Sequence, residues 1–529
     1  MLDLAALAAR RADVEAGFRP TSIGAFVAER CAALGDRPAI DVFERGERAS
    51  YAEVERRTNR IGNALRGLGI ARGDRVALMM SNRLDYPLTW LALAKIGAVH
   101  VPVNTRYTPR EIAYVTGDSG ATALIIEHGF LDAFHAIEQR PAGLTDDRVL
   151  VVGGSFDALV AAAGDEPCLD PAVGPDDLMN IQYTSGTTGF PKGCMLTHEY
   201  WLMTGHAARA WDARPVSRMM SAQPFFYMDP QWHLLKAMGL GATLYLAPQL
   251  SATRFIGWVK RYGIEWCQFP ELMTRQPPAA DDGDTALVQV ATFGWSPETC
   301  RAFKSRFGVR AREGFGMTEI GLGTWVPPEA EALYDSGSVG LPAPFREITI
   351  RDPEGREVPP GAEGELWVRG QGIFKGYWNK PEANADAFRG DWFRTGDIFR
   401  ADEHGLLWLT GRIKDMIRRS SENIAAREVE AVIREIDAIE DCAAVAVPDP
   451  KRGEEVKLYV QLKPGATLDV SAILDHARGR LAAFKVPRYV AFVDGFPRTV
   501  SNKIEKRNLI AGIADLRAGA YDAEAGKWV

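Results

Sequence analysis

The chain has 529 residues, of which 46% are hydrophobic and 25% are charged, and its formal net charge is -7. A chain of this length and composition can bury a large core and is expected to divide into at least two globular domains. The acidic balance argues against a nucleic-acid-binding protein, because no Lys/Arg cluster is interleaved with aromatic residues as such surfaces require.

The cysteines and the N-terminus point to a cytoplasmic protein. The six cysteines include no Cys-x-x-Cys pair, so the sequence predicts neither a zinc site nor a disulfide framework, and reduced thiols are expected. Charged residues interrupt residues 1–16, whereas a signal peptide has a continuous apolar run. No apolar run reaches the roughly 18 residues of a membrane span, so none is expected.

The first 150 residues alternate helical and strand patterns. Ser50 and Glu53 have the spacing of a capping box, a helical apolar pattern follows, and residues 75–80 have the pattern of a buried strand. The alternation then repeats with a helix at 86–96, Gly97 as its C-cap, a strand at 99–103, a helix at 109–116 and a strand at 121–126. This α/β pattern predicts mostly parallel sheets covered by helices.

Residues 183–193 combine four Ser or Thr hydroxyls, three glycines and one lysine, directly after a strand-like run at 178–182. Such a loop can wrap a polyphosphate, because glycines permit close approach and amides, hydroxyls and an ammonium donate to phosphate oxygens. ATP is the obvious candidate. The residues assigned to this function are Thr184, Ser185, Gly186, Thr187, Thr188, Gly189 and Lys192.

The spacing of this loop excludes a P-loop. A P-loop has four residues between its first glycine and Gly-Lys-Ser/Thr, whereas here Gly189 follows Gly186 closely and Lys192 precedes a glycine. An ordinary surface loop is the alternative, since Gly, Ser and Thr are common in loops.

Two further short motifs offer groups for a nucleotide. Residues 314–319 contain Phe315, Thr318 and Glu319, whose ring, hydroxyl and carboxylate could stack a base, contact a phosphate and bind a hard cation. Residues 395–397, Thr-Gly-Asp, place Asp397 in a predicted tight turn, where it could accept hydrogen bonds from both ribose hydroxyls. In isolation this second motif is more often only a turn.

After about residue 411 the pattern changes to a compact α+β unit. A charged segment at 412–422 precedes a helix at 425–435, strands at 442–447 and 456–462, a helix near 470–484 and a strand at 489–493. A small C-terminal domain is therefore predicted after a hinge near Lys414, giving domains at 1–413 and 414–529. A polar loop near the C-terminus contains Lys503.

Five segments of the chain, taken in order, resemble the signatures of the adenylate-forming superfamily: residues 183–193, 314–319, 395–397, 411–430 and 497–507. This superfamily contains acyl-CoA synthetases, peptide-synthetase adenylation domains and luciferases. The resemblance covers nearly the whole chain. It implies an AMP-forming ligase with a small mobile C-terminal domain. A carboxylic acid and Mg²⁺-ATP would give acyl-AMP and pyrophosphate, and a thiol such as that of CoA would then displace AMP.

The resemblance also implies roles for single residues. The loop at 184–192 would hold the β- and γ-phosphates, Thr318 would contact the α-phosphate, and Glu319 would ligate Mg²⁺. Phe315, flanked by Gly314 and Gly316, would lie against adenine, with Asp397 and Arg412 on the ribose. Lys503 would bridge the carboxylate and the α-phosphate in the first half-reaction only. Rotation about Lys414 would then bring the segment 418–423 to the thiol.

Two departures concern the thiol and the catalytic lysine. Ser420 and Ser421, beside Glu422, stand in the predicted CoA tunnel where relatives often have glycines, so the tunnel could be narrower or carry an added donor. Asn502 replaces a frequent glycine before Lys503, and asparagine tolerates a left-handed backbone.

The acyl pocket is predicted from the same resemblance. Its candidate lining residues are Tyr227, Met228, Trp232, Gly294, Trp295, Ile320 and Leu322. Trp295 stands where many relatives have small residues, which favours a small or compact acid, including aromatic and cyclic ones, over a long fatty chain. For Trp232 and Ile320, simple core packing is the alternative. Residues 224–262 also look somewhat like carnitine and betaine CoA ligases, whose quaternary ammonium ligand could contact tryptophans.

Two other functions stay open. An adenylation enzyme could load a carrier protein in place of CoA, although the chain ends soon after the small domain and contains no carrier domain. A catalytically silent nucleotide-binding protein is the second, and it should have lost Lys503, Glu319 or the loop hydroxyls, all of which are present. The sequence leaves a homodimer open.

Overall fold

The computed structural model describes residues 3–184, 191–212, 214–412, 416–419, 422–481, 483–498 and 503–529. The chain forms two compact units. One contains Met1–Ile348 and Val368–Phe393, and the other contains Thr349–Trp367 and Arg394–Val529.

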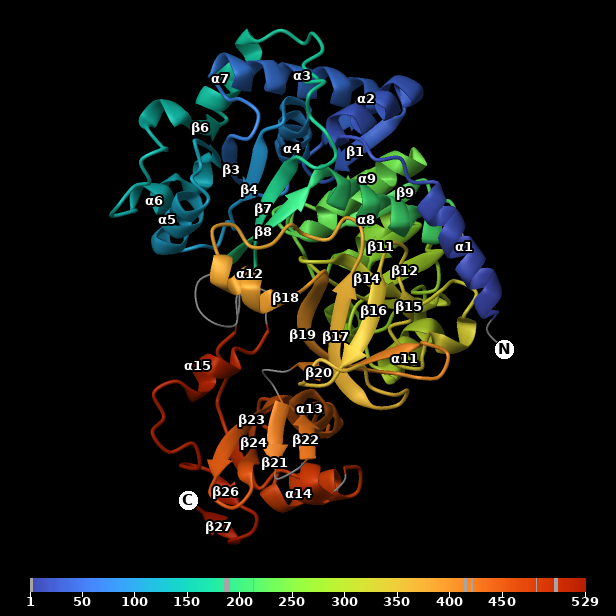
Figure 1. Cartoon of the computed structure of the whole chain (residues 1–529), viewed down its shortest axis with the longest axis vertical. Helices are drawn as coiled ribbons and strands as arrows, with labels where there is room; N and C mark the ends of the chain where they lie inside the picture. The colour runs from blue at the N-terminus through green and yellow to red at the C-terminus, as the bar shows by residue number, and fades with distance from the viewer. Residues whose placement is uncertain are drawn as a thin grey trace. The chain divides into compact units, whose positions relative to one another are not determined.

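A six-stranded sheet forms one part of the first unit, with the strand order β6-β5-β3-β4-β7-β8. All neighbouring pairs are parallel except β7 and β8, which form an antiparallel hairpin. Figure 1 shows helix α4 beside strand β4, with α3 packed on α4. The strands are β3 (Arg75–Met79), β4 (Val99–Pro102), β5 (Ala123–Glu127), β6 (Val149–Val152), β7 (Leu178–Thr184) and β8 (Lys192–Thr197).

The helices around this sheet begin and end where local signals predict. Helix α3 starts with the capping box of Ser50 and Glu53, and α5 starts with a second one. Helix α4 ends at Gly97, which has a φ of 73°. The helices are α1 (Leu4–Ala16), α2 (Ile23–Leu34), α3 (Tyr51–Gly67), α4 (Asp85–Ile96), α5 (Pro109–Asp118), α6 (Leu131–His135) and α7 (Ser155–Ala162). The predicted helix-covered parallel sheet is therefore confirmed.

A nine-stranded sheet forms the rest of the core of this unit, in the order β15-β14-β13-β12-β11-β9-β10-β1-β2. The central run from β1 to β13 is parallel, and the outer pairs are antiparallel. The strands are β1 (Pro38–Val42), β2 (Glu47–Ser50), β9 (Arg218–Ser221), β10 (Thr243–Leu246), β11 (Trp266–Gln268), β12 (Gln289–Thr292), β13 (Ala311–Met317), β14 (Gly321–Trp325) and β15 (Leu341–Pro342).

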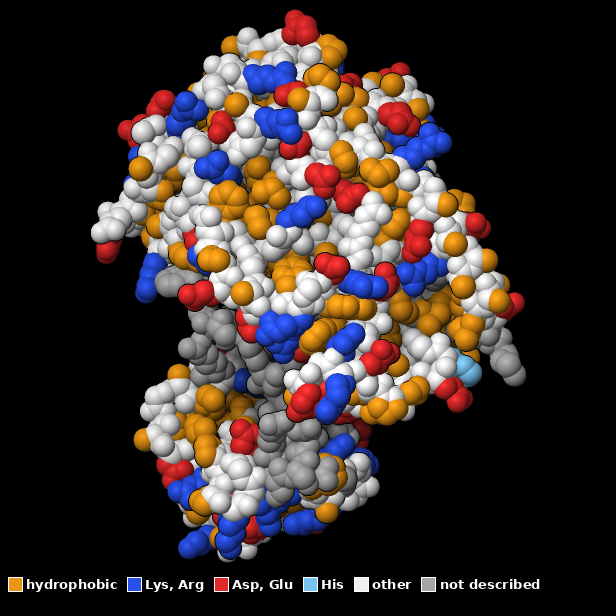
Figure 2. Space-filling model, viewed as in Figure 1, with side chains coloured by type: hydrophobic (Ala, Val, Ile, Leu, Met, Phe, Trp, Pro, Cys, Tyr) orange, Lys and Arg blue, Asp and Glu red, His pale blue; other side chains and the backbone are white. Residues whose placement is uncertain are grey.

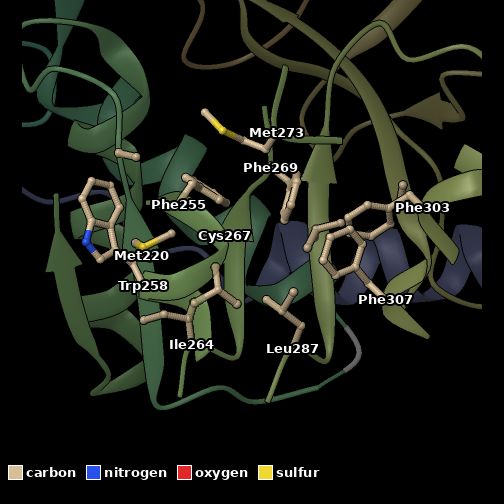
Figure 3. Close-up of a cluster of buried hydrophobic side chains, with 14 of the residues drawn as sticks. Met220, Phe255, Trp258, Ile264, Cys267, Phe269, Met273, Leu287, Phe303 and Phe307 are labelled. Atoms are coloured by element: carbon tan, nitrogen blue, oxygen red, sulfur yellow. The ribbon is translucent and has the colours of Figure 1, made fainter. Parts of the chain in front are cut away.

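Helices pack an aromatic core against this sheet. Figure 3 shows Phe303 and Phe307, from α11, directed toward Phe269, which follows β11. The same buried cluster includes Trp258 and Trp295. The helices of this region are α8 (His198–Trp211), α9 (Met228–Leu240), α10 (Phe255–Arg261), α11 (Pro297–Phe307) and α12 (Pro381–Ala387).

The second unit contains most residues of β16 (Glu347–Arg351), β17 (Glu363–Arg369) and β19 (Trp392–Ala401), together with β20 (Leu407–Arg412). Strand β18 (Phe388–Arg389) pairs with the first residues of β19 within the first unit. A seven-stranded sheet follows along the chain. Its strands are β21 (Met416–Arg419), β22 (Glu422–Ala425), β23 (Ile439–Asp449), β24 (Gly453–Leu462), β25 (Tyr489–Phe492), β26 (Tyr521–Asp522) and β27 (Lys527–Trp528).

The predicted α+β character of this C-terminal region is confirmed, with one correction. Its helices are α13 (Ala426–Arg434), α14 (Val470–Arg478) and α15 (Lys506–Ile510). Helix α14 ends six residues earlier than predicted, at Arg478, and a short 3-10 turn at Ala483–Lys485 follows it. The compact unit also takes in Thr349–Trp367 and the residues from Arg394 onward, so part of it comes from the range 1–413 that the sequence assigns to the N-terminal domain. The hinge at Lys414 lies outside the described residues and stays a prediction.

The surface and the cysteines add two observations. Figure 2 shows acidic and basic side chains interspersed over the visible face. All six cysteines are buried free thiols. Within the described part of the chain, no helix is both long and apolar enough to cross a membrane.

A buried ion cluster joins three elements of the first unit. Asp212 pairs with Lys236 of α9 and Arg312 of β13, and all three side chains are nearly inaccessible. Gln289 donates a further hydrogen bond to Asp212 at 2.9 Å. Burial favours a higher pKa for Asp212, but the two cations outweigh it and hold the pKa below its ordinary value.

Asp212→Asn should therefore destabilise this unit strongly, because two buried cations lose their shared counter-charge. We expect a loss of about 3 kcal/mol or more in the free energy of unfolding, measured by denaturant unfolding. The exposed pair of Glu298 and Arg301 provides the control, and Glu298→Gln should cost less than about 1 kcal/mol. Equal losses in the two variants would contradict a structural role for the cluster.

Candidate active site

The candidate site lies at the carboxyl ends of four neighbouring parallel strands of the first unit. Strands β13, β12, β11 and β9 are adjacent in this order. Because their carboxyl ends share one edge of the sheet, the residues that follow them come together there, where open α/β sheets bind ligands. The half-buried side chains at these ends, called here the strand-end cluster, are Tyr227, Met228, Gln268, Phe293 and Thr318.

The predicted nucleotide motif at 314–319 forms the end of β13 and the turn into β14. A Cβ on Gly314 would lie 2.9 Å from the carbonyl oxygen of Thr324, and one on Gly316 would lie 2.6 Å from that of Gly321. Both glycines are therefore needed for close pairing of the two strands. Phe315 is largely buried, with 7% of its surface exposed, and its proposed contact with adenine stays a prediction.

Thr318 and Glu319 are fixed by contacts from other elements. The hydroxyl of Tyr200, on α8, donates to the carbonyl oxygen of Thr318 at 2.9 Å, and the Thr318 hydroxyl lies 3.7 Å from Met228 Sδ. Glu319 is buried, and its Oε1 accepts a hydrogen bond of 2.9 Å from the hydroxyl of Tyr377. The predicted phosphate-binding hydroxyl and metal-binding carboxylate are thus held next to each other.

Tyr377 also connects Glu319 with the Gly-rich loop. Lys192 Nζ lies 4.7 Å from the centroid of the Tyr377 ring, which is a cation–π contact. Tyr377 and Cys194, on β8, form a backbone bridge. Burial and the neighbouring Glu319 carboxylate raise the pKa of Tyr377. The structure therefore brings two residues of separate predicted motifs, Lys192 and Glu319, to the same aromatic ring.

The Gly-rich loop itself is only partly described. Thr184 and Lys192 are paired at the end of the β7–β8 hairpin, and the Thr184 hydroxyl lies 3.4 Å from the carbonyl oxygen of Lys192. Ser185, Gly186, Thr187, Thr188 and Gly189 lie outside the described residues.

A buried polar network holds the loop that carries Tyr227. Gln231 donates hydrogen bonds from Nε2 to the carbonyl oxygens of Phe225 and Tyr227, at 3.2 and 3.0 Å. Its own Oε1 accepts from Asn180 of β7 at 2.8 Å. Asn180 also contacts His100, whose pKa falls to about 3 because burial disfavours the imidazolium. A neutral histidine thus helps to position the loop.

The residues predicted to line the acyl pocket fall into two groups. Tyr227 and Met228 are half-buried and Gly294 is exposed, so their surfaces are available to a ligand. The others are buried. Trp232 contacts Trp266, and Trp295 contacts Phe269 and Phe303 with ring centroids 6.1 and 5.3 Å apart. The buried members are Trp232, Trp295, Ile320 and Leu322.

The other predicted site residues belong to the second unit. Asp397 and Arg412 are cross-strand partners on β19 and β20, which brings the two predicted ribose ligands together. Thr395–Asp397 lies within strand β19 and does not form the predicted turn, because Gly396, with a φ of 71°, and the Thr395 hydroxyl bond to β17. Lys503 is exposed.

Some predicted residues of this unit cannot be placed. Lys414, Ser420 and Ser421 lie outside the described residues, as do the side chains of Arg412 and Glu422. Their roles stay predictions.

Sequence reasoning missed three polar residues of the site. Tyr377 follows a glycine with a φ of 108° and sits in an aromatic-rich loop, a weak signal in the sequence. Glu313, one residue before the predicted motif, accepts a hydrogen bond of 2.8 Å from the amide of Gly294, and burial raises its pKa to about 7. Asp229, next to Met228, is the third, and burial raises its pKa to about 6.

Comparison with known proteins decides the family. The family model described as AMP-binding enzyme matches residues 27–378, and the model described as AMP-binding enzyme C-terminal domain matches residues 428–503. The chain belongs to the AMP-binding enzyme family. The prediction of an AMP-forming acid–thiol ligase is confirmed, and loading of a carrier protein is not favoured.

Curated members of the family resemble the chain over most of its length. Feruloyl-CoA synthase from Amycolatopsis sp is 35% identical, over 88% of this chain and 94% of that protein. Long-chain-fatty-acid–CoA ligase FadD13 from Mycobacterium tuberculosis is 32% identical, over 89% and 93%. Crotonobetaine/carnitine–CoA ligase from Salmonella arizonae is 33% identical, over 87% and 92%.

The fold agrees with this assignment. The crystal structure of the anthranilate CoA ligase AuaEII in complex with anthranoyl-AMP has a TM-score of 0.83 and 25% identity, covering 92% of this chain and 96% of that one. The predicted fold class, a large N-terminal domain with parallel-containing sheets and a small C-terminal domain, is confirmed.

The Tyr377 hydroxyl offers a direct test of this site. Tyr377→Phe keeps the ring beside Lys192 but removes the donor to Glu319, so we expect acid-dependent ATP–pyrophosphate exchange to slow by about 10-fold. As a control, Tyr334→Phe removes a hydroxyl that donates to the uncharged carbonyl of Pro328 at 3.2 Å, and it should change the rate by less than about threefold. An unchanged exchange rate in Tyr377→Phe would show that this hydrogen bond does not support activation.

Proposed function

We propose that this enzyme activates a compact carboxylic acid as its acyl-AMP, with Mg²⁺-ATP as the nucleotide, and transfers the acyl group to CoA. The observation that carries the nucleotide part is the convergence of Lys192 and Glu319 on Tyr377. This arrangement brings the Lys192 ammonium near the Glu319 carboxylate, which follows Thr318. Binding of a polyphosphate with its metal ion requires both an ammonium for the phosphates and a carboxylate for the metal.

The first half-reaction joins two anions. A carboxylate must attack the α-phosphorus of ATP, so charge neutralisation and in-line positioning matter more than a general base. In this proposal Thr184 and Lys192 bind the β- and γ-phosphates, and Thr318 binds the α-phosphate. Phe315 lies against the adenine, and Asp397 and Arg412 bind the ribose.

Glu319 fits the proposed magnesium ligand. Within the described residues, no group of three or more His, Cys, Asp or Glu side chains could hold a metal ion. Magnesium in nucleotide sites commonly takes only one or two protein carboxylates, and phosphate oxygens and water complete its shell. One buried carboxylate beside the proposed phosphate-binding residues suits that pattern. The bound ion would neutralise phosphate charge.

Lys503 is the proposed cation of the first half-reaction. Its ammonium would stabilise the charge that develops between carboxylate and α-phosphate. The second half-reaction would use the segment at 418–423, after rotation about Lys414, with Ser420, Ser421 and Glu422 lining the CoA path. One active site would then serve both reactions.

The proposed acid is compact because buried aromatic rings fill the space behind the strand ends. Trp295 follows the exposed Gly294 directly and packs against Phe269 and Phe303. An indole in this position shortens any pocket that begins at Gly294. The family contains enzymes named for aromatic, betaine and long-chain acids, so the family alone does not select among them.

A test of Lys503 separates the two half-reactions. Lys503→Ala should lower acid-dependent ATP–pyrophosphate exchange by about 100- to 1,000-fold, as for loss of one transition-state donor. Thioester formation from supplied acyl-adenylate should persist. Lys463→Ala, which removes another exposed lysine of the same unit, should leave both reactions unchanged. Wild-type exchange in Lys503→Ala would refute the assignment.

A test of Trp295 addresses acid size. Trp295→Ala should raise the ratio of kcat/KM for longer acids to that for compact acids, measured with a homologous acid series. Phe307→Ala removes a ring from the same buried cluster without touching Gly294, so it should lower stability and leave the ratio unchanged. An identical acid profile in wild type and Trp295→Ala would exclude a role in the pocket.

A further inference from the structure

Asp229 is an acidic side chain in contact with Gln268 of the strand-end cluster, and the proposed chemistry does not use it. It lies in the first turn of α9, directly after Met228, whose sulfur contacts the Thr318 hydroxyl. The residue is half-buried, so it is not sealed in the core. Asp229 is therefore the chain neighbour of a residue that contacts Thr318, the residue proposed to bind the α-phosphate.

The surroundings of Asp229 supply hydrogen bonds but no opposite charge. Trp232 Nε1 donates to Asp229 Oδ1 at 3.3 Å, and the Gln268 side chain also donates to this carboxylate. Among the described residues, no Lys, Arg or His forms an ion pair with it. Desolvation raises the pKa of Asp229 to about 6, and the two neutral donors offset this only in part. A charged carboxylate in such surroundings is stabilised by a cation.

The neighbouring groups also favour a positively charged ligand. Gln268 Oε1 is a buried acceptor without a hydrogen-bond partner in the described part of the chain. Tyr227 and Phe293 are half-buried aromatic side chains that follow strands β9 and β12, which lie on either side of β11. A carboxylate, a carbonyl oxygen and aromatic faces are the groups that bind ammonium and quaternary ammonium ions.

We propose that Asp229 is a specificity-determining residue that binds a cationic nitrogen on the acid substrate, at the end remote from the reacting carboxylate. This inference rests on the proposed function and narrows its substrate class to compact zwitterionic acids. The reacting carboxylate would lie toward Thr318, and the cation would lie between Asp229 and the aromatic rings of Tyr227 and Phe293. When ATP and such an acid bind together, the site would then contain fewer uncompensated negative charges than with an acid that has no cation.

A matched pair of acids tests the charge alone. The full-length enzyme is assayed by ATP–pyrophosphate exchange with 4-(trimethylammonio)butanoate and with its uncharged isostere, 5,5-dimethylhexanoate. We expect kcat/KM of the wild type to favour the cationic acid by at least about 10-fold, as for a partly desolvated charge pair. A higher kcat/KM for the uncharged isostere would overturn the inference. So would activity with neutral aromatic acids together with no activity toward either of the two probe acids.

Variants at position 229 identify the responsible residue. Asp229→Asn should lower kcat/KM for the cationic acid by about 10-fold or more and change that for the isostere by less than about threefold. Asp229→Glu keeps the charge and should retain the preference for the cationic acid. Asp41 provides the control, because burial also raises the pKa of its carboxylate but it lies on β1, outside the strand-end cluster. Asp41→Asn should leave the ratio of kcat/KM for the two acids unchanged. A parallel loss with both acids in Asp229→Asn would assign Asp229 a merely structural role.

Failure of the proposed function would be distinguishable from failure of the inference about Asp229. Absence of exchange with every acid of a panel of cationic, aromatic and aliphatic acids would contradict the acid-activating function itself. If Asp229→Asn does not fold, as judged by its thermal unfolding transition, the wild-type comparison of the two isosteric acids still decides the inference.

Discussion

The parallel pairing of β9, β11, β12 and β13 is the constraint on which the candidate site depends. Parallel neighbours deliver their carboxyl ends to one edge of the sheet, so residues from distant parts of the sequence meet there without any direct contact along the chain. Register is strict, because a shift of one residue would turn each side chain to the opposite face. The aromatic core around Phe269 and the buried ion cluster of Asp212 both lock this register by joining strands to helices.

The site's shape follows from close backbone packing as well as from side chains. Gly314 and Gly316 let β14 approach β13 closely, which places Thr318 and Glu319 in a short, rigid connection. The buried Gln231 side chain holds the loop of Tyr227 by hydrogen bonds to its carbonyl oxygens, and Asn180, which also contacts His100, donates in turn to Gln231. Such satisfied polar networks fix one geometry, because any displacement leaves buried donors unpaired.

Local signals explain which parts could be predicted from the sequence. Ser50 with Glu53, and Gly97 after a helix, act within one helical turn, so their effect is visible in a short window. The ordered motifs likewise identified the nucleotide-binding class. Tyr377 was missed because its partner Glu319 lies 58 residues earlier, and only the tertiary fold brings them together. Thr395–Asp397 was predicted as a turn because its composition suits one, yet pairing with β20 keeps it in a strand.

The electrostatic problem of this site is that it must bring together a polyphosphate and a carboxylate while carrying carboxylates of its own. The negative charge of each of those carboxylates is compensated or removed in a different way. Glu319, beside Tyr377 and Lys192, is the one proposed to meet a magnesium ion. Glu313 has a pKa raised to about 7 by burial, so near neutral pH it is substantially uncharged while it orders the backbone at Gly294.

Asp229 completes this reasoning. Its pKa of about 6 leaves it mostly ionised at neutral pH. It has no proposed magnesium role, and no cationic side chain of the described residues forms an ion pair with it. An uncompensated carboxylate in contact with the strand-end cluster would oppose the binding of an acid that carries only negative charge. It would favour an acid that brings its own cation, since that cation compensates Asp229 and reduces the net charge entering the site. The same residue thus resolves the site's electrostatic conflict and selects the substrate.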